Sequence, residues 1–181
     1  MKMERRKIKN EELKRLSTEE FKKEKKNPIV VVLDNVRSLN NVGSVFRTCD
    51  AFLVEKLYLT GITGQPPHRE IQKTALGATE SVEWEYETGV VETIKKLRKE
   101  GYVILAVEQV SDGKLLNKYF PDMTSQYALV FGNEVFGVSD GVIEIVDDSI
   151  EIPQLGTKHS LNIAVSVGIL VWDLCQKLKS D

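Results

Sequence analysis

Short apolar runs alternate with amphipathic segments along most of the chain. Residues 28–33 and 102–107 are continuous apolar runs rich in β-branched side chains, the pattern of strands buried on both faces of a parallel sheet. Between such runs, apolar residues recur every three or four positions, as in a helix with one buried face. Because strands and helices alternate, we expect an α/β fold with a mostly parallel sheet. The pattern predicts strands at 28–33, 56–60, 81–86, 102–107, 128–131 and 150–152, and helices at 42–52, 68–76, 88–99, 139–146 and 159–177.

The first 27 residues differ from the rest of the chain in their charge. They hold 11 Lys or Arg and 6 Glu, a net charge of +5, so the other residues, with 14 Lys or Arg and 21 Asp or Glu, carry −7. One or two short helices are predicted here, the second capped by Ser17. A basic arm on an acidic body suits a polyanion such as RNA, although a solvated helix with paired charges gives the same pattern. We therefore divide the chain into a basic helical arm, residues 1–27, and one α/β domain, residues 28–181.

Composition limits the class of protein. The apolar fraction of 41% and the charged fraction of 29% are ordinary for a globular chain of 181 residues. No apolar run reaches ~18 residues, so no membrane span is expected, and the charged N-terminus does not resemble a secretory signal. The two cysteines, Cys49 and Cys175, form neither a C-x-x-C pair nor a disulfide framework, so a cytoplasmic location is expected.

Polar side chains gather in three segments that follow predicted strands. Asn41 and Arg47 come after the first strand, Glu134 after the fifth, and Ser160 and Asn162 after the last. Ligands bind at such carboxyl-end loops in open α/β sheets, and Arg47 is predicted early enough in its helix to point back over the loop. Structural roles are the alternative: Asn41 and Ser160 can cap helices, and Arg47 and Glu134 can form an ion pair. Asn162 lies in an apolar run, so its amide is predicted to be buried and to need hydrogen-bond partners.

Several kinds of site lack their sequence signature. G-x-G-x-x-G is absent, and residues 156–160 end like a phosphate-binding loop but lack its glycine spacing. His68 and His159 have no nearby cysteine or second histidine, so no metal site is predicted. No serine stands in a G-x-S-x-G context.

Three motifs, in order along the chain, resemble those of the SpoU (TrmH-like) RNA ribose 2′-O-methyltransferases. Residues 41–47, Asn-Val-Gly-Ser-Val-Phe-Arg, resemble motif 1, N-x-G-x-x-x-R. Residues 131–137, Phe-Gly-Asn-Glu-Val-Phe-Gly, resemble motif 2, centred on G-x-E-x-x-G. Residues 152–162, Ile-Pro-Gln-Leu-Gly-Thr-Lys-His-Ser-Leu-Asn, resemble motif 3, I-P-x-x-G-x-x-x-S-L-N. The resemblance covers about residues 28–177, and Ala75 and Gln154 stand where the family often has Ser and Met.

The resemblance implies the SPOUT fold, a Rossmann-like, mostly parallel α/β sheet whose C-terminal segment threads a deep trefoil knot. It implies S-adenosylmethionine as the methyl donor and no metal. The cofactor is expected to be bound mainly by backbone groups, at Val107, Glu108, Gly132, Ile152 and Leu161. Members of the family are usually homodimers whose active site takes residues from both subunits, so a homodimer is expected here.

By the same resemblance, Arg47 is the central catalytic residue. In the family this arginine is often proposed as a general base, but a guanidinium stays protonated. We therefore expect Arg47 to anchor an RNA phosphate and to stabilise the developing alkoxide. Asn41 is expected to orient Arg47, and Glu134 to hold its guanidinium or to relay a proton. Ser160 and Asn162 are expected to fix the knot loop and to contact RNA or Arg47.

The RNA substrate is the part of the function that the sequence defines least. The arm and residues 61–69 are candidate contacts with RNA. The arm resembles no ribosomal-protein-like RNA-binding module, which favours tRNA over rRNA as the substrate. One alternative is a non-catalytic RNA-binding protein that retains the SPOUT fold, and the intact set of motif residues argues against it. The other is a nucleotide-binding α/β enzyme unrelated to methylation, and the missing phosphate-loop spacing argues against that one.

Overall fold

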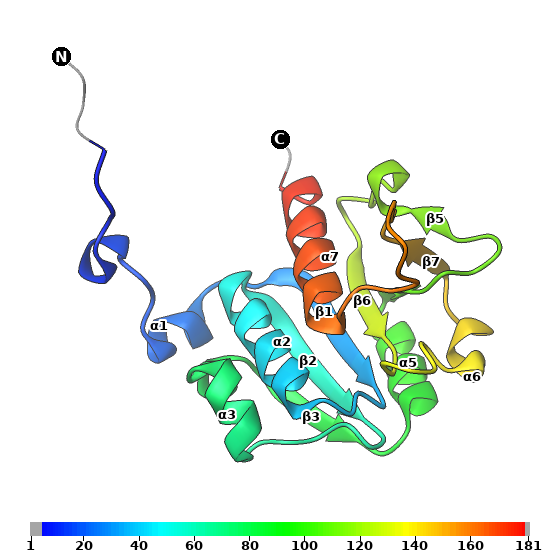
Figure 1. The fold of residues 1–181 in the computed structure, drawn as a ribbon, viewed down its shortest axis with the longest axis horizontal. Helices are drawn as coiled ribbons and strands as arrows, with labels where there is room; N and C mark the ends of the chain where they lie inside the picture. The colour runs from blue at the N-terminus through cyan, green and yellow to red at the C-terminus, as the bar shows by residue number, and fades with distance from the viewer. Residues whose placement is uncertain (1–4, 180–181) are drawn as a thin grey trace.

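The computed structural model describes residues 5–179, so the first four residues of the predicted arm and the last two of the predicted domain lie outside it. Seven strands form the sheet, in the order β3-β2-β1-β6-β4-β7-β5 (Figure 1). The pairings between them are parallel, which confirms the predicted α/β fold with a mostly parallel sheet. The strands are β1 (Asn27–Asp34), β2 (Val54–Thr60), β3 (Trp84–Glu87), β4 (Tyr102–Ala106), β5 (Lys114–Leu115), β6 (Gln126–Phe131) and β7 (Asp148–Glu151).

Helices cover both faces of the sheet and give it two cores. Alternate residues of β1 face opposite sides, so Val31 belongs to the core under α2 and α7, whereas Val32 belongs to the core under α5. Both residues are fully buried, which explains the unbroken β-branched run. The helices are η1 (Asn10–Leu13), α1 (Thr18–Lys23), α2 (Leu39–Ala51), α3 (Arg69–Ala75), α4 (Ala78–Ser81), α5 (Val90–Lys99), η2 (Leu116–Lys118), α6 (Asp140–Ile143) and α7 (Ile163–Lys177).

Two helices begin three or four residues away from their predicted starts, and in both the cap explains the difference. The backbone N–H of Asn41 donates to the Ser38 hydroxyl over 3.3 Å, so Ser38 caps α2 and Asn41 lies inside its first turn. Helix α7 begins after Asn162, whose side chain caps it, so Ser160 is not the cap. Strand β5 lies between the predicted strands at 102–107 and 128–131, where no strand was predicted. A two-residue strand has no periodicity to detect.

Within the predicted arm, one apolar side chain holds α1 on the body. Phe21 is 4% exposed and joins the core under α2 and α7. Ser17 caps α1 in a capping box with Glu20, as predicted. Residues 5–16 extend away from the sheet (Figure 1), and those of their side chains that are described are exposed.

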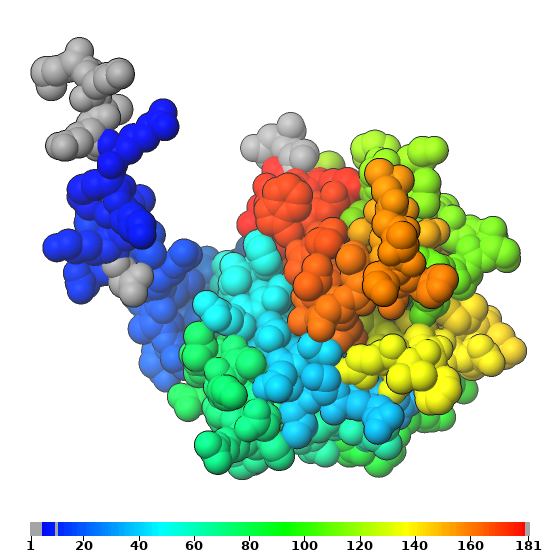
Figure 2. Space-filling view, in the orientation of Figure 1, coloured from blue at the N-terminus to red at the C-terminus, as the bar shows by residue number. Residues whose placement is uncertain are grey.

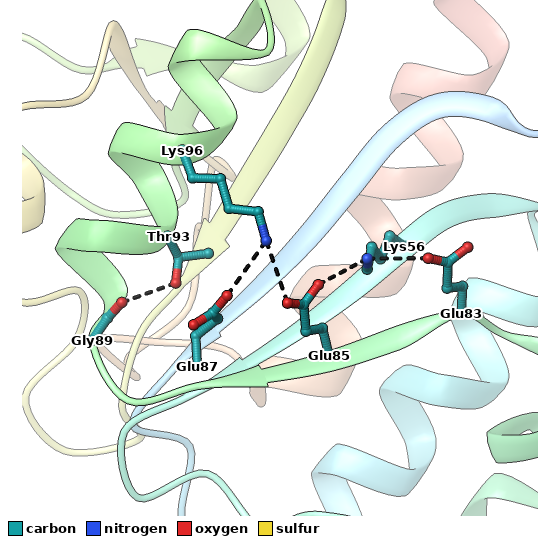
Figure 3. A network of polar contacts seen from close by, with 7 residues as sticks. All are labelled: Lys56, Glu83, Glu85, Glu87, Gly89, Thr93 and Lys96. Carbon is teal, nitrogen blue, oxygen red and sulfur yellow. Dashed lines mark hydrogen bonds and ion pairs between the residues drawn. The ribbon is translucent and has the colours of Figure 1, made fainter.

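The outer strand β3 carries a network of charges (Figure 3). Lys56 Nζ lies 3.0 Å from a Glu83 carboxylate oxygen and 2.9 Å from one of Glu85. Lys96 Nζ, from α5, lies 3.3 Å from Glu85 and 3.4 Å from Glu87. An exposed sheet edge is a template for further strands, and charged side chains discourage such pairing. We therefore assign this network a structural role.

Both cysteines lie inside the fold. Cys49 and Cys175 are free and buried, and burial raises the pKa of the Cys175 thiol to about 11, so it stays protonated at neutral pH. Within residues 5–179, no helix combines the length and the apolar character needed to cross a bilayer. In the same range, no group of three or more His, Cys, Asp or Glu side chains is placed to hold a metal ion.

Candidate functional site

One large cavity lies at the carboxyl ends of β4, β6 and β7, which are neighbours in the sheet. Its volume is about 800 Å³, within the range of ~300–1,000 Å³ that is usual for small-molecule sites. Parallel sheets bind ligands at this edge. Arg47 does not line the cavity, but the other nine predicted site residues do: Asn41, Val107, Glu108, Gly132, Glu134, Ile152, Ser160, Leu161 and Asn162.

The loop after β6 is closed on itself by hydrogen bonds. The backbones of Asn133 and Gly137 exchange N–H···O bonds of 2.8 and 2.9 Å, and Asn133 Oδ1 accepts from the N–H groups of Val135 and Phe136 at 2.9 and 3.2 Å. Gly137 has a φ of +71°, a conformation that favours glycine. A Cβ on Gly132 would lie 2.0 Å from the backbone carbon of Gly137. This loop therefore requires glycine at both of its ends.

Glu134 ties this loop to the loop after β1. Its carboxylate oxygens accept hydrogen bonds from the backbone N–H groups of Arg37 and Ser38, each over 3.0 Å. Partial burial raises the pKa of the Glu134 carboxyl, but these hydrogen bonds outweigh burial, so the net pKa lies below the ordinary value. The ionised carboxylate therefore holds two loops together. Within residues 5–179 of this single chain, no hydrogen bond or ion pair joins Glu134 to the Arg47 guanidinium, so that predicted contact stays a prediction.

Two amide side chains complete a chain of hydrogen bonds that joins the three motif segments. Asn41 Nδ2 donates to Glu134 Oε1 over 3.3 Å, and Asn162 Nδ2 donates to Asn41 Oδ1 over 3.1 Å. The three residues come from the start of α2, the loop after β6 and the start of α7. In Figure 2 the yellow surface of the β6 loop adjoins the orange surface of the segment before α7. Asn41 thus connects Glu134 to Asn162. Within residues 5–179 its side chain makes no hydrogen bond to Arg47, so the predicted orienting role stays a prediction.

Arg47 lies outside this chain of hydrogen bonds. Arg47 was predicted within the first turn and a half of its helix. Because α2 begins at Leu39, Arg47 lies in the third turn instead. Its side chain is exposed, and the described part of the chain offers it no hydrogen-bond or ion-pair partner. An exposed guanidinium with all of its donors free is available to an anion outside this chain.

Ser160 and Asn162 lie on the exposed side of the cavity, so the predicted burial of Asn162 is wrong. The Asn162 amide still has partners, because its Oδ1 accepts from the Ala164 N–H over 2.8 Å and its Nδ2 donates to Asn41. The apolar run that suggested burial is divided between core and surface. Ile163 is 8% exposed, whereas Val165 is 49% exposed.

The loop after β4 contributes side chains that the sequence did not single out. Glu108 was predicted as a backbone contact, but its carboxylate also accepts from the N–H groups of Gln109 and Val138, at 2.9 and 3.0 Å. Gln109 Nε2 donates to the His159 carbonyl over 3.2 Å. These bonds join the loops after β4, β6 and β7. The available signal was the position of two polar residues directly after a buried strand.

Asp34 is a second residue that sequence reasoning missed. It ends β1, is 1% exposed, and accepts from Asn35 Nδ2 at 2.7 Å and from the Ser139 N–H at 3.0 Å. Asn133 Nδ2 donates to the Asn35 carbonyl over 2.7 Å. The loop after β6 is therefore fixed to β1 on one side and to β4 on the other. A carboxylate at the end of an apolar strand was the signal for this role.

Comparison with known proteins finds one family. Residues 28–172 match the model of the SpoU rRNA Methylase family. The tRNA (guanosine(18)-2′-O)-methyltransferase of Aquifex aeolicus is 33% identical over 167 residues, which are 89% of this chain and 74% of that protein. The protein of the same name from Thermus thermophilus is 28% identical over 170 residues, 93% of this chain and 86% of that one. The crystal structure of an AdoMet-bound rRNA methyltransferase from Sinorhizobium meliloti is similar with a TM-score of 0.78 at 25% identity, covering 86% of this chain and 59% of that chain.

Proposed function

This chain belongs to the SpoU rRNA methylase family, and we propose that it transfers a methyl group from S-adenosylmethionine to a ribose 2′-hydroxyl of RNA. The observation that supports this most directly is the chain of hydrogen bonds from Glu134 through Asn41 to Asn162, which joins three motif segments at one cavity. Two similar proteins are named as tRNA 2′-O-methyltransferases, and a similar structure holds the methyl donor.

The cavity suits S-adenosylmethionine in its chemistry. Val107, Ile152 and Leu161 line it with apolar surface for an adenine ring, while Glu108 and the backbone around Gly132 offer polar groups. We propose that these five residues hold the cofactor. S-adenosylmethionine supplies a methyl group on a sulfonium, and this group can pass to an oxygen nucleophile in a single in-line displacement.

The residues of this chain have two tasks in such a displacement. The bonded set of Asn41, Glu134 and Asn162 fixes the relative positions of the cavity walls, which serves the alignment of donor and acceptor. We assign the second task to Arg47 and Ser160. Arg47 binds an RNA phosphate and stabilises the charge that develops on the ribose oxygen, because a guanidinium remains protonated. Ser160, on the exposed side of the cavity, contacts the RNA.

We propose a homodimer as the form that brings Arg47 into the site. Val165, Ile169 and Trp172 form a stripe on α7, and they are 49%, 37% and 53% exposed. Helix α2, which carries Arg47, lies beside α7 (Figure 1). In a twofold dimer the same patch is buried on both subunits. A partner that covers the α7 stripe therefore comes close to Arg47 as well.

We also propose the deep trefoil knot that the family resemblance implies. The sheet order places β7 beyond β4, whereas α7 packs beside α2 on the other side of β6. The segment between β7 and α7 therefore passes the loops after β4 and β6. On its way it is bonded to the loop after β4, through His159 and Gln109, and to the start of α2, through Asn162 and Asn41.

The division into a basic arm, residues 1–27, and a methyltransferase domain, residues 28–181, is part of the same proposal. The +5 charge of the arm and the exposure of the described side chains among residues 5–16 support an RNA-binding role. We favour tRNA over rRNA as the substrate. The free, buried thiols of Cys49 and Cys175 agree with a cytoplasmic location.

The proposal is tested by cofactor binding and methyl transfer measured on the full chain. S-adenosylmethionine should raise the melting temperature, because a ligand that binds only the folded protein stabilises it. ATP and NAD should leave the melting temperature unchanged. The protein should then transfer the labelled methyl group to tRNA that lacks ribose methylation. Transfer to rRNA that lacks ribose methylation should be less efficient. Cofactor binding without transfer to either RNA would instead favour a non-catalytic RNA-binding protein. Stabilisation by ATP or NAD alone would contradict the assignment.

A further inference from the structure

A second hollow adjoins the cavity across the loop after β6. Its volume is about 400 Å³. Its walls come from the loop after β6 and from the carboxyl ends of β1, which lies next to β6 in the sheet, and of β2, which lies beyond β1. Asn133, Phe136 and Gly137 line both spaces. The loop after β6 is therefore a shared wall, with the cavity on one side and this hollow on the other.

Phe136 stands on that shared wall and is 84% exposed. Its backbone N–H donates to Asn133 Oδ1, and the neighbouring carboxylates of Glu134 and Asp34 fix the loop to its surroundings. The backbone is thus held in place while the aromatic ring meets solvent, although burial of a ring of this size is favourable. A ring presented on a fixed backbone loses little freedom when a partner covers it.

Arg37 adds a positive charge to the hollow. Its backbone N–H is fixed by Glu134, whereas its side chain is exposed and has no hydrogen-bond or ion-pair partner anywhere in residues 5–179. Ile62, which also lines the hollow, is 66% exposed. The hollow therefore combines an aromatic ring, an aliphatic side chain and a free guanidinium.

The chemistry of the reaction determines where a nucleobase must lie. In a nucleotide, C1′ is bonded both to the base and to C2′, which carries the reacting hydroxyl. A ribose whose 2′-oxygen reaches the cavity therefore places its base just outside the cavity. Bases that leave the RNA stack are usually received by aromatic side chains, and a guanidinium donates to the acceptors on their edges.

We propose that the second hollow receives the base of the methylated nucleotide, with Phe136 stacking on the base and Arg37 donating to its edge. This inference rests on the proposed function and adds the position of the substrate to it. Phe136 and Arg37 then determine which base the enzyme binds and how tightly, whereas the methyl donor is held by the five cofactor-binding residues proposed above.

The first test compares Phe136 with an equally exposed phenylalanine that lines neither space. Phe136→Ala should raise KM for RNA about 10-fold, as expected for the loss of one base–ring stack, and should leave the Kd of S-adenosylmethionine unchanged. Phe136→Trp should restore KM, because it keeps an aromatic face. Phe120→Ala is the matched control, since Phe120 is 81% exposed and should leave KM unchanged.

The second test removes the base instead of the ring. An RNA with an abasic ribonucleotide at the methylated position keeps the 2′-hydroxyl but offers nothing to stack on. With this RNA, Phe136→Ala and the unaltered protein should show equal KM. If Phe136→Ala raises KM equally for the abasic and the intact RNA, or raises it for neither while methyl transfer proceeds, the stacking proposal is overturned and the methyltransferase assignment stands. An unaltered protein that methylates no RNA would instead overturn the proposed function itself.

Discussion

The two ends of α2 lie in contrasting surroundings. At the first turn, Asn41 is bonded to Glu134 and to Asn162, which come from two other segments of the chain. Six residues later, Arg47 is exposed and has no partner in the part of the chain that the structure describes. Both residues belong to one short motif. The contrast separates a residue that builds the site from one that is available to a molecule outside this chain.

This contrast predicts different consequences for substitutions at the two ends of α2. A residue whose hydrogen bonds are all made within the fold should affect stability and cofactor binding when it is replaced. A residue without partners should affect transfer alone. The two effects can be measured separately, as melting temperature and cofactor Kd on one hand and as the rate of methyl transfer on the other.

Arg47→Ala should have the largest effect on activity. We expect the rate of methyl transfer to fall by about 10²–10³, the usual loss when one donor to a developing oxyanion is removed. The melting temperature and the Kd of S-adenosylmethionine should not change, because the exposed Arg47 side chain has no hydrogen-bond or ion-pair partner within residues 5–179. Arg47→Lys keeps the charge but not the paired donors, and should recover only part of the rate. An alanine variant that transfers at the normal rate would remove Arg47 from the mechanism.

Trp172→Glu tests the proposed homodimer, in which a second subunit covers the α7 stripe and comes close to Arg47. A carboxylate in the α7 stripe should weaken a dimer by about 30-fold or more, because interface hot spots, in which tryptophan is enriched, cost at least ~2 kcal/mol when they are lost. Sedimentation at micromolar concentration should show a monomer, and methyl transfer should fall with the dimer fraction. Lys95→Glu, on the opposite face of the sheet, is the control and should remain dimeric. If the unaltered protein is itself a monomer that transfers methyl groups, the dimer proposal is wrong.

Glu134→Ala tests the hydrogen-bonded first turn of α2, because Glu134 accepts a hydrogen bond from Asn41. The change leaves the N–H groups of Arg37 and Ser38 without their carboxylate acceptor. We expect a loss of about 1 kcal/mol of stability, modest because the carboxylate is partly solvated, together with weaker binding of S-adenosylmethionine. Glu134→Gln keeps one acceptor oxygen, so its stability and its Kd for S-adenosylmethionine should lie between those of the unaltered protein and of Glu134→Ala. Calorimetric Kd values that are equal for all three proteins would show that this carboxylate does not hold the cavity in shape.

The smallest effect should come from acidification. The folded-state pKa of Glu134 is lowered by its hydrogen bonds, so its contribution to stability is complete above the unfolded pKa of ~4.3. That contribution is lost as the pH falls through the lower, folded value. The difference in melting temperature between the unaltered protein and Glu134→Gln should therefore be constant near neutral pH and should shrink below about pH 4. A difference that grows on acidification would have the wrong sign for this account.

The strands were predictable because burial on both faces leaves a plain signal. The apolar, β-branched composition of β1 and β4 was almost enough to predict both strands. The polar residues at their carboxyl ends indicated a site. The start of α2 was harder to locate, because Ser38 and Asn41 are both good caps and only the hydrogen bond to Ser38 decides between them. β5 was missed because two residues hold no period.

The membership of the site was predictable, but its pairings were not. Nine of the ten expected residues line one cavity, since motif loops at one edge of a parallel sheet must converge. Which carboxylate binds which donor depends on small differences in distance between side chains of segments 93 positions apart in the sequence. Sequence alone therefore paired Glu134 with Arg47, whereas the carboxylate is bonded to backbone N–H groups and to Asn41. Burial of Asn162 was overestimated for a related reason, because an apolar run does not reveal that some of its residues face outward.

The most direct test of the central claim is to identify the nucleoside that the protein produces. RNA that has accepted the methyl group should be digested to nucleosides and analysed by mass spectrometry, alongside the same RNA with a 2′-deoxynucleotide at the modified position. We predict a 2′-O-methylnucleoside from the first RNA and no product from the second. A base-methylated nucleoside, or equal methylation of both RNAs, would contradict the account.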